Sequence, residues 1–324
     1  MTMKVHTQKV SWQQILDRYL LVKQAQGLAD RTIEDVRYHV TLFLDRTSIK
    51  SRDYELLRTA VLEYFASTAS LSPVTFNIRR KVLKGFFSWM KSEKMIPGDP
   101  LEGIKRLKED ELPRSVEEDT LRRLLTVPNK TTFAGLRDYA LILLTMDTGI
   151  RPKEACGLQM EDFDLKTLDV MIPAHVAKTR LSRTLPLSSI TGEAVSGLIS
   201  ARHPLWDKTV PVFCTEDGTT LTHNAWDRRM DIYSQKLGVK VQPYALRHTF
   251  ALMYLRHGGN AFSLQKTLGH TTLTMTRRYV ALTQQDLRSQ HDLASPLKSL
   301  LPKRNRVHKI REDGKDNSPE RLTS

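Results

Sequence analysis

The stretch from Met95 to Arg114 constrains the fold most, because it interrupts a chain that otherwise mostly follows helical periodicity. It combines a charge cluster and few large apolar residues with Pro97, Gly98, Pro100, Gly103 and Pro113. Prolines and glycines at this density are typical of loops. The chain has 324 residues, a length at which two domains are expected. We therefore expect residues 95–114 to link an N-terminal domain, residues 1–94, to a second domain.

Four helices are predicted before this linker, and apolar residues recur in each of them at helical spacing. A capping box at Ser11 opens the first helix. The second begins near residues 30–32, and the third covers about residues 53–68. The fourth opens at Ser72, which precedes a proline of the kind favoured in a first helical turn. Together they predict a small all-α domain.

Positive charge dominates the chain, with a formal net charge of +14 and a pI near 9.7. A protein this basic is expected to bind a polyanion, most often nucleic acid, although a merely solubilising excess of lysine is the alternative. The fourth helix concentrates this charge in Arg79, Arg80, Lys81 and Lys84. We interpret these four as contacts to a DNA backbone, with an ordinary solvated helix face as the alternative.

The second domain, residues 115–292, is predicted to be mainly helical with a small β-sheet. A capping box at Ser115 should open its first helix. Residues 169–173 and 182–187 are predicted to be two short strands joined by a turn that carries Lys178. Helical patterns dominate the rest, so the whole chain is expected to be mainly α with a small β-sheet, an α+β protein. From residue 293 to 324 the chain is polar and basic, and we expect a disordered tail.

Two cysteines, Cys156 and Cys214, lie far apart without metal-type partners nearby. This pattern argues against a disulfide framework and indicates a reducing compartment, so we expect a cytoplasmic protein. The N-terminus lacks the apolar segment of a signal peptide, and no apolar run approaches the roughly 20 residues that span a membrane. The histidines form no HExxH motif or Cys/His ladder, so we expect no metal site and no cofactor.

Four short motifs carry the candidate chemistry of the second domain. In chain order they are Thr148-Gly149-Ile150-Arg151-Pro152-Lys153-Glu154, Pro243-Tyr244-Ala245-Leu246-Arg247-His248, Leu268-Gly269-His270 and, nine residues later, Tyr279. We expect the fold to bring Arg151 to Arg247, so that the pair holds a phosphate for Tyr279. Guanidiniums suit a phosphate because they are planar, permanently charged and able to grip two oxygens at once. Structural ion pairs and a packed tyrosine are the alternatives.

The order and spacing of these motifs resemble the tyrosine recombinase (phage integrase) family over about residues 11–292. The N-terminal domain resembles the family's core-binding domain, an all-α SAM-like fold. The resemblance implies a site-specific recombinase that cuts and rejoins double-stranded DNA without ATP. Tyr279 would attack the scissile phosphate, form a 3′-phosphotyrosine and leave a free 5′-hydroxyl. It also implies a homotetramer on DNA, because recombination of two duplexes needs four active sites.

By the same resemblance, Arg151 and Arg247 stabilise the charge that develops on the phosphate. His270 hydrogen-bonds the phosphate. Glu154 lies one helical turn after Arg151 and orients an arginine, with an ordinary salt bridge as the alternative.

The resemblance also implies that a lysine on the β-hairpin protonates the leaving 5′-oxygen. Lys178 matches this position, although Arg180 and Arg183 of the same hairpin could be confused with it. The arginines and the lysine supply the electrostatic stabilisation that Mg²⁺ gives other nucleases.

Tyr244 departs from the family pattern, which usually has histidine three residues before Arg247. A tyrosine hydroxyl has a reference pKa of about 10, so it can donate a hydrogen bond but is a poor base at neutral pH. We expect Tyr244 to act by hydrogen bonding alone. His248 follows Arg247, and we expect it to point to another helix face, away from the site.

Two other functions fit part of this pattern. A type IB topoisomerase shares the chemistry but exchanges no strands, and a non-catalytic DNA-binding protein would tolerate Tyr244. Among recombinases, both an integrase or transposase of a mobile element and a resolver of chromosome dimers fit the motifs. By resemblance, the weakly apolar stretch after Tyr279 should dock into a neighbouring protomer; it carries Leu282, Leu287, Leu293 and Leu297.

Overall fold

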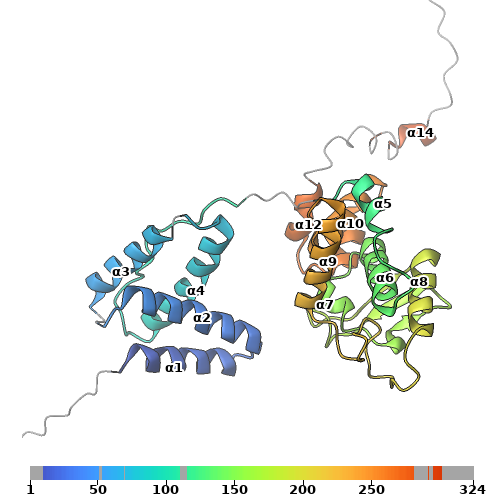
Figure 1. Cartoon of the computed structure of the whole chain (residues 1–324). Coiled ribbons are helices and arrows are strands. Elements are labelled where there is room, and N and C mark those ends of the chain that lie inside the picture. The colour runs from blue at the N-terminus through green and yellow to red at the C-terminus, as the bar shows by residue number, and fades with distance from the viewer. Residues whose placement is uncertain are drawn as a thin grey trace, which may run out of the picture. The chain divides into compact units, whose positions relative to one another are not determined.

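The computed structural model describes residues 10–50, 53–68, 70–109, 115–280, 291 and 295–300. The chain forms two compact units, Met1–Glu111 and Leu112–Ser324, each drawn in Figure 1. Most of the predicted C-terminal tail and most of the stretch expected to dock into a neighbour lie outside the described residues. None of the helices in the described ranges has the length and apolar character needed to cross a membrane.

The N-terminal unit is a four-helix domain. Its helices are α1 (Trp12–Ala25), α2 (Asp30–Thr47), α3 (Tyr54–Ser67) and α4 (Pro73–Ser92). The capping box predicted at Ser11 is confirmed, because its hydroxyl accepts from the Gln14 backbone while the Gln14 side chain accepts from the Ser11 backbone. Ser72 caps α4 as predicted. Aromatic rings fill the core, where Phe43, Phe86 and Phe87 are fully buried.

The chain after α4 packs on the N-terminal unit instead of running free. Ile96 and Leu101 are buried in that unit's core. The Asn77 amide donates to the Leu107 carbonyl at 2.9 Å and accepts from the Leu107 backbone N–H at 3.0 Å. Residues 95–109, predicted as linker, therefore belong to the first unit, because two apolar side chains anchor an otherwise loop-like sequence.

The second unit is mainly helical with a small sheet, so the predicted fold class is confirmed. Its elements are α5 (Glu118–Leu124), α6 (Phe133–Thr148), α7 (Pro152–Ala155), a 3₁₀ turn (Met160–Asp162), β1 (Phe163–Asp164), β2 (Asp169–Ile172), β3 (Arg183–Pro186), α8 (Ser189–Ser200), α9 (His223–Leu237), α10 (Pro243–Arg256), α11 (Ala261–Leu268) and α12 (Leu273–Val280). A short helix α14 (Leu297–Leu300) follows. The sheet is antiparallel in the order β1-β2-β3, with Val170 opposite Leu185.

Both predicted strands are confirmed, whereas β1 was missed because it has only two residues. The capping box predicted at Ser115 is wrong: α5 starts at Glu118, and its N-cap residue makes no side-chain cap. The extended chain before α5 is bonded to α10 instead, since the Val116 N–H donates to the Thr249 hydroxyl at 2.8 Å.

Helix α6 organises the second unit. It is buried along most of its length and packs against α8 and α10 (Figure 1). It ends at Gly149, whose φ of +62° favours glycine. A Cβ at Gly149 would lie 2.3 Å from a Phe250 ring carbon of α10 and 2.8 Å from a Leu268 methyl of α11. The close approach of these three helices therefore requires glycine, and it defines the site described below.

Cys156 and Cys214 are both buried free thiols. Burial raises the pKa of Cys156 to about 12, so this thiol is protonated and unreactive at neutral pH.

Candidate active site

Arg247 lies in the first turns of α10 and is only 1% exposed. Its guanidinium donates to the Gly149 carbonyl at the end of α6 and, at 2.7 Å, to the Leu268 carbonyl at the end of α11. The C-terminal end of a helix carries partial negative charge. Two helix ends therefore hold this cation in place.

Arg151 reaches the same turn from the start of α7. One of its guanidinium nitrogens donates to the Gly269 carbonyl at 3.2 Å, next in sequence to the carbonyl that Arg247 uses. The structure thus brings Arg151 and Arg247 together, as the sequence predicted. Burial, followed by the charge of Arg151, lowers the pKa of Arg247 to about 10. Two buried cations this close provide a ready site for an anion.

Glu154 connects the arginines to the β-hairpin. Its carboxylate is 1% exposed and pairs with Arg151 at 3.0 Å and with Arg183 of β3 at 2.6 Å. It also accepts the Lys178 backbone N–H at 3.2 Å. Burial acts to raise the pKa of Glu154, but the hydrogen bond and charge of Arg183 and the charge of Arg151 outweigh it, and this pKa is lowered. The predicted contact between Glu154 and an arginine is present.

His270 follows Gly269 and touches Arg247. Its Nε2 lies 3.2 Å from an Arg247 nitrogen, and its Nδ1 lies 2.9 Å from the hydroxyl of buried Thr276. Burial, followed by the charges of Arg247 and Arg151, lowers the pKa of His270 to about 4. The ring is therefore neutral at pH 7. Since arginine can only donate, Nε2 accepts from it and Nδ1–H donates to Thr276.

Tyr279 lies on α12 and is 3% exposed, packed in a cluster with Phe250 and Leu264. Its hydroxyl lies 2.6 Å from Nδ1 of His248. The expectation that His248 points away from the site is therefore wrong. Helix α12 packs against α10, and this brings Tyr279 next to His248, the residue that follows Arg247. Adjacency to Arg247 was the only sequence signal available for His248.

Tyr244 lies one turn before His248 on α10 and is 46% exposed. Its ring meets the His248 ring edge to face, with centroids 5.1 Å apart. The His248 ring in turn lies 5.7 Å from the Tyr279 ring. Tyr244 thus packs against the histidine that contacts Tyr279.

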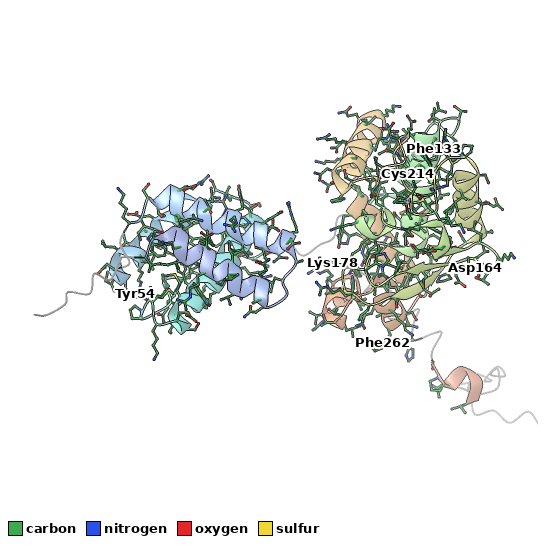
Figure 2. All side chains as sticks on the ribbon, turned by 90° about the horizontal axis from the view of Figure 1, so that it is seen from below. Tyr54, Phe133, Asp164, Lys178, Cys214 and Phe262 are labelled. Atoms are coloured by element: carbon green, nitrogen blue, oxygen red, sulfur yellow. The ribbon has the colours of Figure 1, made fainter. Side chains whose placement is uncertain are left out.

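Lys178 lies on the exposed loop between β2 and β3 (Figure 2). Arg180 is exposed on the same loop. Arg183 is committed elsewhere, since it pairs with Glu154 and its Nε–H donates to the Thr267 carbonyl at 3.1 Å. The side chain of Arg183 is therefore held inside the protein, whereas the Lys178 side chain is exposed on the loop. Of these two residues, Lys178 better fits the predicted role of the hairpin cation. A groove of about 570 Å³ between this loop and α11 borders His270.

The four basic residues predicted to contact DNA on α4 do not form one exposed face. Arg79 is only 8% exposed, with its guanidinium 5.9 Å from the centre of the Tyr64 ring. Its position continues the buried helical stripe of Phe76, Leu83 and Met90, which the prediction overlooked. The structure therefore does not support Arg79 as a DNA contact.

The other three differ among themselves. Arg80 is half-buried and donates to the Ile104 carbonyl at 2.6 Å, and Lys84 is exposed but pairs with Asp99. Both thus attach the chain after α4 to the helix. Lys81 is exposed, and it is the residue of the four that best suits contact with a partner.

The cluster as a whole combines cations with a phenol. The cluster contains two buried arginines, an adjacent neutral histidine, a nearby loop that carries a lysine, and the buried Tyr279 hydroxyl. This set of groups fits a reaction in which an oxygen nucleophile attacks a phosphate diester. In the described ranges, no group of three or more His, Cys, Asp or Glu side chains could hold a metal ion.

Comparisons with known proteins agree with this geometry. The tyrosine recombinase XerD of Shewanella oneidensis is 30% identical over 285 residues, which cover 82% of this chain and 92% of that protein. XerC of Shewanella amazonensis is 27% identical over 296 residues, covering 89% and 97%. The structure of the XerH site-specific recombinase bound to a palindromic difH substrate has a TM-score of 0.66 at 22% identity, covering 87% and 84%.

The family model described as the phage integrase family matches residues 114–286. That range contains Arg151, Lys178, Arg247, His270 and Tyr279. It spans more than half of the chain, and the match to XerD extends the likeness into the N-terminal unit. With the fold and the arginine–tyrosine cluster on the same residues, the chain belongs to the phage integrase family of tyrosine recombinases.

Proposed function

We propose that this site-specific recombinase cuts double-stranded DNA with Tyr279 as its nucleophile and rejoins it through a 3′-phosphotyrosine intermediate. The observation that carries the proposal is geometric: the buried Tyr279 hydroxyl contacts His248, the residue after Arg247, while Arg247 and Arg151 donate to the adjacent carbonyls of Leu268 and Gly269. Burial raises the pKa of the Tyr279 hydroxyl, while the charges of Arg247 and Arg151 act to lower it. These guanidiniums therefore lie where they would stabilise a phenolate and the phosphate that it attacks.

A scissile phosphate would supply a counter-anion for Arg247, which bonds to two backbone carbonyls and to His270 but forms no ion pair with a carboxylate among the described residues. Arg151 already pairs with Glu154. Arg151 and Arg247 would each direct guanidinium N–H groups at the non-bridging oxygens. The negative phosphate would also raise the pKa of His270 from its low value, so that Nε2 can carry a proton and donate to the same phosphate. These roles agree with those that the sequence motifs imply.

Lys178 is assigned to the leaving group. When the Tyr279 oxygen bonds to phosphorus, the bond from phosphorus to the 5′-oxygen breaks, and that oxygen needs a proton. The Lys178 ammonium would supply it. Its loop is attached to Glu154 through the Lys178 backbone N–H, so the loop is positioned by the carboxylate that also holds Arg151.

The partner is double-stranded DNA, and recombination of two duplexes calls for a homotetramer of this chain. The XerH structure among the similar proteins is a recombinase bound to its DNA substrate, which supports DNA as partner here. We assign DNA binding to both units, with the four-helix N-terminal unit as the core-binding domain and residues 115–292 as the catalytic domain. Lys81 of α4 is the first candidate for a backbone contact in the N-terminal unit.

The test is covalent capture. The purified full chain is incubated in EDTA with nicked duplexes from DNA flanking its own gene, and an SDS-resistant protein–DNA adduct is sought beside a gel shift. An adduct in the wild type that is absent in Tyr279→Phe is the expected result. A sequence-specific shift without any adduct, or an adduct that persists in Tyr279→Phe, would refute the assignment of the nucleophile.

A further inference from the structure

The contact between His248 and Tyr279 is the shortest polar contact described for the nucleophile. The Tyr279 oxygen lies 2.6 Å from Nδ1 of His248, within the range of a strong hydrogen bond. Tyr279 is 3% exposed, and the half-buried His248 ring packs against the Tyr244 ring. Neither Arg151 nor Arg247 can accept a proton at neutral pH. Among the described residues, His248 is therefore the nearest basic acceptor for a proton that leaves the phenol.

The protonation states support the same direction of transfer. Burial, followed by the charges of Arg247 and Arg278, lowers the pKa of His248 to about 4, so the imidazole is neutral at pH 7. A neutral imidazole has one donor and one acceptor nitrogen. The phenol O–H is the stronger acid of the two groups, so it donates and Nδ1 accepts. Burial meanwhile raises the pKa of Tyr279, so the nucleophile starts as a phenol and has to lose a proton.

We propose that His248 is the general base of this enzyme, taking the Tyr279 proton as the phosphodiester is attacked. The proposal rests on Tyr279 being the nucleophile. The Tyr279 oxygen forms its bond to phosphorus while its proton moves to Nδ1 of His248. The bond from phosphorus to the 5′-oxygen breaks, and that oxygen takes a proton from Lys178. In rejoining, the imidazolium returns its proton to the departing phenol oxygen.

The bound phosphate makes this transfer feasible. Besides Tyr279, the titratable and charged groups that face His248 are Tyr244, Arg247 and Arg278. The phosphate neutralises the charge of Arg247, which removes one of the effects that keep His248 unprotonated. General base catalysis typically contributes about 10² to 10⁴ in rate, which sets the size of the effect to be measured.

The test compares variants in single-turnover cleavage of a nicked duplex. His248→Asn places a neutral acceptor near the position of Nδ1 but cannot hold the proton. His257→Asn, an exposed histidine at the end of the same helix, is the matched control. Each protein is measured with an ordinary 5′-oxygen leaving group and with a bridging 5′-sulfur, which leaves without protonation.

We expect His248→Asn to cleave at least about 100-fold more slowly than wild type with both leaving groups, with unchanged DNA affinity. Lys178→Ala should be slow with oxygen and normal with sulfur, because it lacks only the acid. Added imidazole should restore cleavage by His248→Ala and leave His257→Asn unaffected. A purely structural histidine would give no such rescue.

Two results would overturn the proposal: cleavage by His248→Asn within about threefold of wild type, or no imidazole rescue of a folded His248→Ala. If His248→Asn does not fold, the rescue of His248→Ala decides. Failure of the wild type itself to form an adduct at Tyr279 would instead remove the proposed function, so the two failures are distinguishable.

Discussion

Replacing Glu154 with glutamine tests whether one carboxylate holds Arg151 in place. The substitution preserves the size of the side chain and removes its charge. Arg151 and Arg183, whose side chains are 9% and 10% exposed, would each lose an anionic partner. The glutamine keeps one acceptor oxygen, but its NH₂ group would face guanidinium donors. We expect a loss of both stability and cleavage.

The size of the stability loss follows from this burial. Removing one partner of a buried ion pair costs about 3–5 kcal/mol, and the remaining acceptor oxygen favours the lower end of that range. In a unit of roughly 200 residues, each kcal/mol lowers the melting temperature by about 2–4 °C. Glu154→Gln should therefore lower the melting temperature of the second unit by about 6–12 °C.

Thermal unfolding of the full chain at pH 7, followed by circular dichroism, measures this change. Glu161→Gln, at an exposed carboxylate of the same unit, is the control and should change the melting temperature by little. Arg183→Gln combined with Glu154→Gln should cost less than the two single changes together, because the two residues form one pair. A melting temperature for Glu154→Gln within about 1 °C of the control would contradict the reasoning.

Further perturbations follow from the same site. His248 and His270 have pKa values of about 4 in the folded chain, against an ordinary value of 6.5. Between these pH values the unfolded chain therefore binds more protons than the folded chain. The free energy of unfolding should fall as the pH drops from 6.5 towards 4, and it should fall less steeply in His248→Asn. Gly149→Ala should cost about 1–3 kcal/mol more in urea unfolding than Gly238→Ala, since both have positive φ but only Gly149 lacks space for a Cβ; equal losses would contradict this. Tyr244→His should keep or raise adduct formation, and complete loss of the adduct would refute a purely hydrogen-bonding Tyr244. Adduct formation should persist in EDTA, because arginines and lysine supply the charge stabilisation; strict dependence on Mg²⁺ would indicate another chemistry.

The sequence predicted well wherever a local signal and the chemistry agreed. Ser72 before a proline marked the start of α4, and the strands flanking Lys178 were recognised from their composition. The meeting of Arg151 and Arg247 was also foreseen, because both lie in motifs whose order resembles that of a family with a known site. The glycine that ends α6 explains this meeting physically, since its carbonyl is one of the two that hold Arg247.

The features that the sequence did not predict depend on contacts between segments far apart in the chain, or on which face of a helix a residue occupies. The contact between His248 and Tyr279 depends on the direction in which α12 returns to α10, and no local sequence pattern predicts that direction. Arg79 was predicted to contact DNA because of its positive charge. Its helical spacing, three residues after Phe76 and four before Leu83, places it on the buried stripe of α4 instead. Residues 95–109 resemble a loop in composition, yet Ile96 and Leu101 anchor them in the N-terminal core.

Tyr279 is buried against α10 and α11 of its own chain, and this determines which protomer of an assembly would contribute each part of an active site. Within the part of the chain that the structure describes, one protomer supplies both Tyr279, the proposed nucleophile, and the arginines near it. Under the proposed mechanism, each copy would hold a complete active site, and assembly would control when cleavage occurs without having to complete that site. Protomers carrying Tyr279→Phe mixed with protomers carrying Arg247→Gln should therefore yield no adduct, because neither copy can lend its intact half to the other.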